Sequence, residues 1–234
     1  VRGRPAAACR SGTAKVVCWG DPSSGKTTPP PEVDGTSGTA TAIASGSDYS
    51  CAIQAGTGKV FCWGHPDPGY DYGQTEPPAA VDGADGTATA ISSGPYHSCA
   101  SQTATERVVC WGNDEFGQLT PPAAVDGTDG TASAIAAGGN HTCAIQSATG
   151  KVVCWGNDRD GASTPPIAVD GSTSGTAIAI AANQEASLAI VDVPEPGALA
   201  ACAVSLGVVF ALRSRRADCA GSRVPWVPPR VPIV

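Results

Sequence analysis

Basic residues are scarce in this sequence, and their scarcity narrows the classes of function that it can serve. The 234 residues include 14 Lys and Arg against 21 Asp and Glu, so the formal net charge is −7. Binding to nucleic acid without sequence preference depends on Lys and Arg side chains that neutralise backbone phosphates. We therefore expect no nucleic-acid partner.

Charged residues as a whole are also few, and Met is absent. Charged residues make up 15% of the chain and aromatic residues 5%, whereas 41% of the residues are hydrophobic. A hydrophobic share of this size argues against a disordered chain. The 29 Gly and 20 Pro residues favour many short strands joined by turns over long helices. The composition therefore predicts an all-β protein.

An internal repeat organises most of the chain. Val-Asp-Gly recurs with a Pro-Pro pair before each copy, and Cys-Trp-Gly begins at Cys18, Cys62, Cys110 and Cys154. Repeats of roughly 45 residues that contain several short strands are typical of β-propellers, with one blade per repeat. Residues 177–192 look like the decayed start of a fifth repeat, in which Leu188 replaces the first Cys. The prediction is a β-propeller of about four to five recognisable blades.

A second Cys precedes each Cys-Trp-Gly, and the spacing suits two opposed strands of a hairpin. Cysteines at directly opposed positions of an antiparallel pair are close enough to form a disulfide. The predicted pairs are Cys9 with Cys18, Cys51 with Cys62, Cys99 with Cys110, and Cys143 with Cys154. Zinc binding and reduced core thiols are the alternatives, but the spacing is not that of a zinc knuckle. Four disulfides would require an oxidising compartment.

The repeat resembles the regulator-of-chromosome-condensation repeat in its bacterial, Cys-rich form. The resemblance covers about residues 6–191, and "IAAGGNHTCAIQSATGKVVCWGNDRDG" (residues 135–161) carries it best. It implies a propeller. Because the sequence starts and stops in mid-blade, either the propeller is small or irregular, or upstream blades are missing; the second interpretation is favoured.

The segment "GDPSSGKT" (residues 20–27) matches the phosphate-binding loop pattern letter for letter. That pattern functions only between a strand and a long helix. Here Thr28 and then three prolines (Pro29, Pro30 and Pro31) follow, and the prolines disfavour such a helix. We expect a connecting loop of the blade and no nucleotide-binding residue.

The C-terminal part resembles a PEP-CTERM sorting signal. It combines a Pro-Glu-Pro-Gly motif, an uncharged apolar span at residues 198–212 that is expected to form a short hydrophobic helix, and an Arg cluster. The resemblance implies export across the inner membrane of a Gram-negative bacterium, anchoring there, and processing by an exosortase-type peptidase. The cell surface or extracellular matrix would then be its location. The expected sorting residues are Pro194, Glu195, Pro196, Gly197, Arg213, Arg215 and Arg216.

Three regions are therefore expected along the chain. Residues 1–192 would form the propeller, residues 193–216 the sorting signal, and residues 217–234 a Pro-rich, disordered tail. The first residues, "VRGRPAAACRSG", contain no apolar stretch like a signal peptide. Together with the start in mid-blade, this indicates a missing N-terminus.

Few residues stand out as catalytic or metal-binding candidates. His97 and His141 share one repeat position and are interpreted as structural turn residues, and the repeated Trp residues as packing between blades. Acidic residues in 67–73 and 157–161 could suit Ca²⁺, but neither segment has full calcium-loop spacing, so solvated loops are favoured. Asp34, Asp82, Asp126 and Asp170 precede Gly, as Asp does in turns. We expect no catalytic residue, no metal site and no cofactor.

The prediction is an exported, non-catalytic scaffold that binds a surface protein or polysaccharide, with inhibition of a secreted enzyme as one variant. The loops at residues 67–72, 76–78 and 114–118 are the expected binding segments. A secreted hydrolase or lyase with a site on the propeller face is the alternative from another class. An intracellular repeat domain is the other alternative, and export disfavours guanine-nucleotide exchange.

Overall fold

The computed structural model describes residues 6–8, 15–64 and 68–192. Helical structure in these residues is confined to η1 (Ser23–Gly25) and α1 (Ala79–Asp82). The strands are β1 (Ala6–Ala8), β2 (Val17–Trp19), β3 (Ala40–Ser45), β4 (Tyr49–Gln54), β5 (Val60–Gly64), β6 (Ala88–Ser93), β7 (His97–Gln102), β8 (Val108–Gly112), β9 (Ala132–Ala137), β10 (His141–Gln146), β11 (Val152–Gly156), β12 (Thr176–Ala182) and β13 (Ser187–Asp192).

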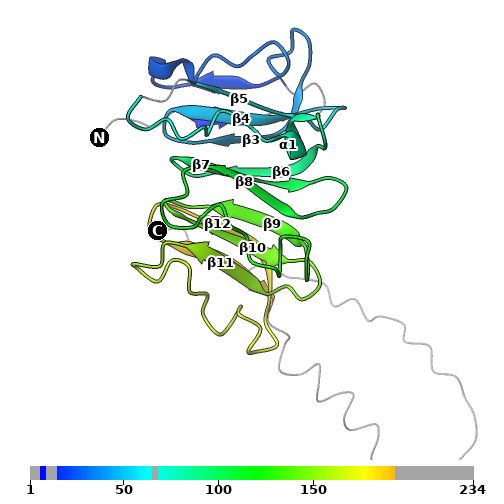
Figure 1. Ribbon diagram of the computed structural model, residues 1–234, viewed down its shortest axis with the longest axis vertical. Helices are drawn as coiled ribbons and strands as arrows, with labels where there is room; N and C mark the ends of the chain where they lie inside the picture. The colour runs from blue at the N-terminus through cyan, green and yellow to red at the C-terminus, as the bar shows by residue number, and fades with distance from the viewer. Residues whose placement is uncertain (1–5, 9–14, 65–67, 193–234) are drawn as a thin grey trace, which may run out of the picture. The chain divides into compact units, whose positions relative to one another are not determined.

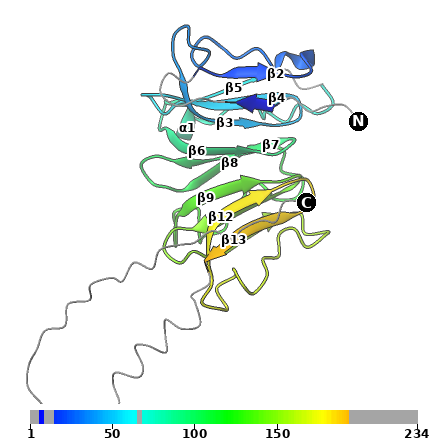
Figure 2. The same cartoon turned by 180° about the vertical axis from the view of Figure 1, so that it is seen from behind.

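Each repeat of the sequence forms one antiparallel sheet. The sheets have the strand orders β1-β2, β3-β4-β5, β6-β7-β8, β9-β10-β11 and β12-β13. The first strands of successive sheets contact one another, β3 with β6, β6 with β9, and β9 with β12 (Figures 1 and 2). This arrangement confirms the predicted all-β, propeller-like architecture. The expected C-terminal helix lies outside the described residues.

Small residues allow the sheets to approach closely where the first strand of each ends. A Cβ atom on Gly94 would collide with the carbonyl oxygen of Gly138 in the next sheet. A Cβ atom on Gly138 would in turn lie 2.7 Å from the carbonyl oxygen of Asn183. Real Cβ atoms do not come so close to other heavy atoms, so glycine is required at these positions for neighbouring first strands to converge.

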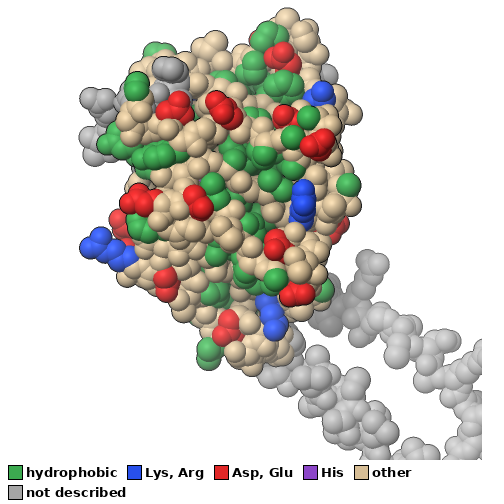
Figure 3. Space-filling view, in the orientation of Figure 1, with side chains coloured by type: hydrophobic (Ala, Val, Ile, Leu, Met, Phe, Trp, Pro, Cys, Tyr) green, Lys and Arg blue, Asp and Glu red, His purple; other side chains and the backbone are tan. Residues whose placement is uncertain are grey.

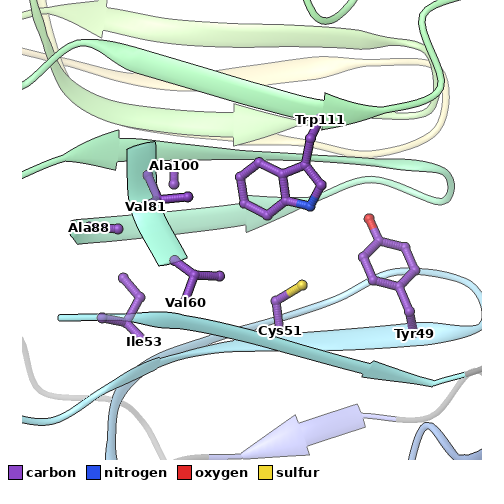
Figure 4. Packing of buried hydrophobic residues seen from close by; sticks show 8 residues of the cluster. All are labelled: Tyr49, Cys51, Ile53, Val60, Val81, Ala88, Ala100 and Trp111. Carbon is purple, nitrogen blue, oxygen red and sulfur yellow. The ribbon is translucent and has the colours of Figure 1, made fainter. Parts of the chain in front are cut away.

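The hydrophobic core lies between neighbouring sheets. In one cluster, Tyr49, Cys51 and Ile53 from β4 face residues of the next repeat. Figure 4 shows Trp111 on β8 and Tyr49 on β4 pointing into the same space between their sheets. Equivalent clusters occur between the other sheets. The protein is thus stabilised mainly by burial between repeats, as expected for stacked repeat units.

The repeated Trp residues also form polar contacts between sheets. The indole Nε1–H groups of Trp63, Trp111 and Trp155 donate to backbone carbonyl oxygens of the preceding repeat, at 3.0, 3.1 and 2.9 Å. The acceptors are the carbonyl groups of Lys26, Gln74 and Gln118. The predicted packing role holds for these three residues, which are buried, whereas Trp19 is 53% exposed.

Disulfides cross-link three of the hairpins. Cys51–Cys62, Cys99–Cys110 and Cys143–Cys154 are bonded, and each pair occupies directly opposed positions in its two strands. The first hairpin differs from the prediction, because Ala7 rather than Cys9 lies opposite Cys18. Cys9 itself lies outside the described residues, so its pairing with Cys18 stays a prediction.

Candidate functional site

His97 and His141 are the first residues of β7 and β10, and they connect sheets through hydrogen bonds. His97 Nε2 lies 2.9 Å from Thr142 Oγ1, and His141 Nε2 lies 2.9 Å from Ser187 Oγ. In the preceding repeat, Tyr49 Oη lies 2.9 Å from Ser98 Oγ. Each of these side chains thus contacts the next repeat at the equivalent Ser or Thr. This bridging role explains why the repeat position carries a ring with a polar atom.

Burial should make the stability of the protein depend on pH through His97. Burial, with the nearby His141 adding to it, lowers the pKa of His97 to about 4, although Asp114 acts in the opposite direction. In the unfolded chain the pKa would be about 6.5. Between these values the unfolded state binds more protons, so stability is complete above pH 6.5 and falls towards pH 4, by on the order of 3 kcal/mol.

Chemical denaturation of the wild type and His97→Gln at several pH values would test this prediction. Gln retains a polar group that can reach Thr142 but does not titrate in this range. The variant should therefore show a clearly weaker loss of stability between pH 6.5 and pH 4. An identical pH dependence in both proteins would contradict the assignment to His97.

The segment at residues 20–27 does not have the structure of a phosphate-binding loop. It contains the short η1, and no α-helix follows within the described residues 15–64. Lys26 is buried, and its Nζ donates to Asp48 Oδ1 at 3.0 Å and to the Ser47 carbonyl oxygen at 3.1 Å. Its ammonium group is thus used to connect two repeats.

The acidic residues at Val-Asp-Gly are turn residues, as predicted. The Oδ1 atoms of Asp34, Asp82, Asp126 and Asp170 each accept a hydrogen bond from the backbone N–H two residues later. The side-chain hydrogen bond with Thr36 is the main cause that lowers the pKa of Asp34. Such local bonds are what Asp provides in turns.

In the segment at residues 157–161, the Asp158 carboxylate forms hydrogen bonds with nearby residues of the same loop. Asp158 accepts hydrogen bonds from the Ser163 N–H and the Thr164 hydroxyl group. Among the described residues, no group of three or more His, Cys, Asp or Glu side chains is placed to hold a metal ion. Asp67 of the other candidate calcium loop lies outside the described residues.

One end of the sheets carries the exposed loops, and we call it the loop face. It consists of the turns at residues 46–48, 94–96, 138–140 and 183–186, together with the segments at 68–76, 113–119 and 157–164 that follow the third strands. The two sets meet, since the Asn113 N–H donates to the Tyr96 carbonyl oxygen and the Asn157 N–H to that of Asn140. The described part of the predicted binding segment at 67–72 and the segment at 114–118 lie in this face, and the segment at 76–78 begins in it.

Aromatic side chains gather on the loop face. The rings of Tyr70 and Tyr96 stack with centroids 5.7 Å apart, and Tyr72 meets Tyr96 edge-on at 5.9 Å. Tyr70 and Tyr72 are exposed, as is Phe116 in the following repeat at the position equivalent to Tyr72. Tyr96 carries no signal of its own in the sequence, because it comes from a different repeat segment and joins the group only in the fold.

Two buried glutamines fix the backbone beneath these aromatic residues. Gln74 accepts from the Tyr72 N–H at 2.7 Å and donates to the Tyr70 carbonyl oxygen at 2.8 Å. Gln118 accepts from the Phe116 N–H at 2.8 Å. Lys26 and Ala162 take the equivalent positions in the other repeats, where no aromatic residue is present. In both segments an aromatic residue is followed by Gly-Gln, and this shared pattern is the signal in the sequence that could have identified the arrangement.

Two cavities open between the loops of this face. One, of about 250 Å³, is lined by Tyr96 and by polar residues that include Asn140, Asn157, Arg159 and Glu185. The other, of about 530 Å³, lies at the ends of the first strands β3, β6, β9 and β12 and is lined mostly by small residues. Glu185 is the only ionisable residue among the described residues that line this second cavity.

The exposed charge of the loop face is mainly negative. Its exposed acidic residues among those that the structure describes are Asp71, Glu76, Asp114, Glu115, Asp158, Asp160 and Glu185, and its exposed basic residue is Arg159. The space-filling view likewise shows more acidic than basic side chains on the side it displays (Figure 3). Such a surface repels anionic ligands and favours neutral or cationic ones.

The expected sorting residues, from Pro194 to Gly197 and from Arg213 to Arg216, lie outside the described residues. No helix among the described residues is long and apolar enough to span a membrane. The sorting signal and its processing peptidase therefore remain predictions.

The comparisons with known proteins agree with this fold. The profile of the "Regulator of chromosome condensation (RCC1) repeat" matches residues 88–118 and 132–162. Each segment begins with the first strand of its sheet, β6 or β9, and ends in the loop-face segment that follows the third strand, β8 or β11. The chain therefore has an RCC1-like repeat fold. No curated protein matches the sequence.

Solved structures with the same architecture are distant in sequence. The CRINKLY WD40 ectodomain of the Arabidopsis thaliana receptor kinase ACR4 shares 22% identity over 82% of this chain and 58% of its own, with a TM-score of 0.58. The ectodomain of the Physcomitrella patens receptor kinase CR4 also shares 22% identity, over 82% and 47%, with a TM-score of 0.61. Prp20p from Saccharomyces cerevisiae shares 16% identity, over 82% and 55%, with a TM-score of 0.54.

This chain thus spans about half the length of the structures that it matches. At these identities the likeness establishes the fold alone.

Proposed function

We propose that this chain is an exported, non-catalytic propeller scaffold whose loop face binds a protein or polysaccharide at the surface or in the matrix of a Gram-negative bacterium. The observation that carries the proposal is the exposed group of Tyr70, Tyr72 and Phe116 on loops that buried glutamines hold in place. Exposed aromatic residues on a fixed backbone supply contact area at little cost in conformational entropy.

Export is supported by the three disulfides, since disulfides persist in oxidising compartments. It is also supported by the resemblance of residues 193–216 to a sorting signal that an exosortase-type peptidase would process. The intact mass of the native protein under non-reducing conditions tests this part. A C-terminus near residues 194–197 would agree with export and sorting, whereas a chain that retains Val234 would contradict them.

The alternative of a secreted hydrolase or lyase requires acids and bases that converge at one site. At the ends of the first strands, where such a site would lie in a propeller, the cavity is lined by Ser, Gly, Pro and Ala together with Asn183, Gln184 and Glu185. A single carboxylate supplies neither an acid–base pair nor an activated nucleophile. The lining of this cavity therefore favours the scaffold over an enzyme with its site at the ends of the first strands.

Binding of the labelled full chain to cells and matrix of its native organism tests the loop face directly. The triple variant Tyr70→Ala/Tyr72→Ala/Phe116→Ala should bind at least about ten-fold less, since several exposed anchors are removed. Ile167→Ala is the matched control, because Ile167 is 69% exposed but lies outside the segments that make up the loop face. Equal binding by the triple variant and the wild type would contradict the proposal.

A further inference from the structure

The aromatic residues on the loop face are not required by the repeat. Positions equivalent to Tyr72 carry Phe116, Ser24 and Asp160 in the other repeats, so a blade forms without an aromatic ring there. The chain has only 4 Tyr, and all except the buried Tyr49 lie together on this face. Large apolar rings that the fold does not need and that remain exposed indicate a binding surface.

The cavity of about 250 Å³ continues this aromatic group, because Tyr96 belongs to both. Its volume is slightly below the range typical of sites for drug-sized ligands, so it suits a single sugar ring. Asn140, Asn157 and Gln184 provide amides that both donate and accept hydrogen bonds. Arg159 adds donors, and Asp160 and Glu185 add acceptors. A wall of this kind matches the mixed donors and acceptors of sugar hydroxyl groups.

We propose that the loop face binds an uncharged polysaccharide, with sugar rings against Tyr70, Tyr72 and Tyr96 and the hydroxyl groups of a neighbouring sugar in the cavity. The negative face of an aromatic ring attracts the partly positive C–H groups of a sugar ring. The exposed carboxylates of this face repel anionic polysaccharides, and the amides of the cavity match the hydroxyl groups of a neutral one. This inference rests on the proposed function and names the class of partner for the same site.

Affinity electrophoresis of the full chain in gels containing dextran, hydroxyethyl cellulose or galactomannan tests the inference. At least one of these neutral polymers should retard the wild type, and alginate, which is anionic, should not. Tyr70→Ala/Tyr72→Ala should weaken the retardation at least about ten-fold. Tyr70→Phe/Tyr72→Phe, which keeps both rings, and the control Ile167→Ala should behave like the wild type.

Two results would overturn the inference. One is no retardation by any of the neutral polymers, and the other is retardation that the loss of both Tyr rings leaves unchanged. Unchanged thermal unfolding of the variants, whose altered side chains are exposed, would show that the fold is intact.

Treating the native cells with periodate or with protease distinguishes a failure of this inference from a failure of the proposed function on which it rests. Binding that periodate oxidation of surface sugars abolishes, and that protease treatment spares, supports a saccharide partner. Binding that protease abolishes and periodate spares, while still depending on Tyr70 and Tyr72, leaves the scaffold function standing and overturns the saccharide. Binding that does not depend on these residues overturns both.

Discussion

Replacing Trp111 with Ala is expected to lower the free energy of unfolding by about 3 to 5 kcal/mol, the usual cost of truncating a buried Trp. Trp111 is buried in the cluster with Tyr49, Cys51 and Ile53 of the preceding sheet (Figure 4). Its removal also leaves the Gln74 carbonyl oxygen without the indole N–H, which lies 3.1 Å away. Urea unfolding of the variant and the wild type would measure the loss.

Trp19 provides a matched control within the same chain. It occupies the equivalent repeat position, but 53% of its surface is exposed. Trp19→Ala should therefore cost no more than about 1 kcal/mol, since little burial is lost. If the two variants lost similar stability, packing between repeats would not be the main source of stability.

Removing one disulfide is expected to cost about 3 kcal/mol. Each bond closes a short loop with a sequence separation of 11 residues. The restriction of the unfolded chain by a loop of this length accounts for a value of that size. The double variant Cys99→Ala/Cys110→Ala would be compared with the wild type by chemical denaturation under non-reducing conditions.

The same comparison under full reduction is the control. If the bond acts as a cross-link, the difference between the two proteins should largely disappear when all disulfides are reduced. A difference that persists would mean that packing of the Cys99 side chain, which is fully buried, is responsible instead.

Features fixed within one repeat could be predicted from the sequence. The pairing of Cys51 with Cys62 follows from an antiparallel hairpin whose turn centres on Gly56 and Thr57, and the structure confirms that register. The turn role of Asp34 likewise depends only on its neighbours. Periodicity was sufficient for these elements because the interactions are local.

Features that arise between repeats could not be predicted in the same way. Tyr70 and Tyr96 lie 26 positions apart in the sequence, and only the docking of two sheets brings their rings together. His97 was interpreted as a turn residue, whereas its ring bridges β7 and β10. The register of the first hairpin was wrong, because Ala7 takes the position opposite Cys18.

Hydrogen–deuterium exchange tests most directly whether the loop face is the binding surface. Exchange of the full chain would be measured with and without matrix material from its native organism. If the loop face binds this material, backbone amides in residues 70–76 and 113–119 should exchange more slowly. Protection confined to the turns at the opposite ends of the strands, at residues 55–59, 103–107 and 147–151, would contradict it.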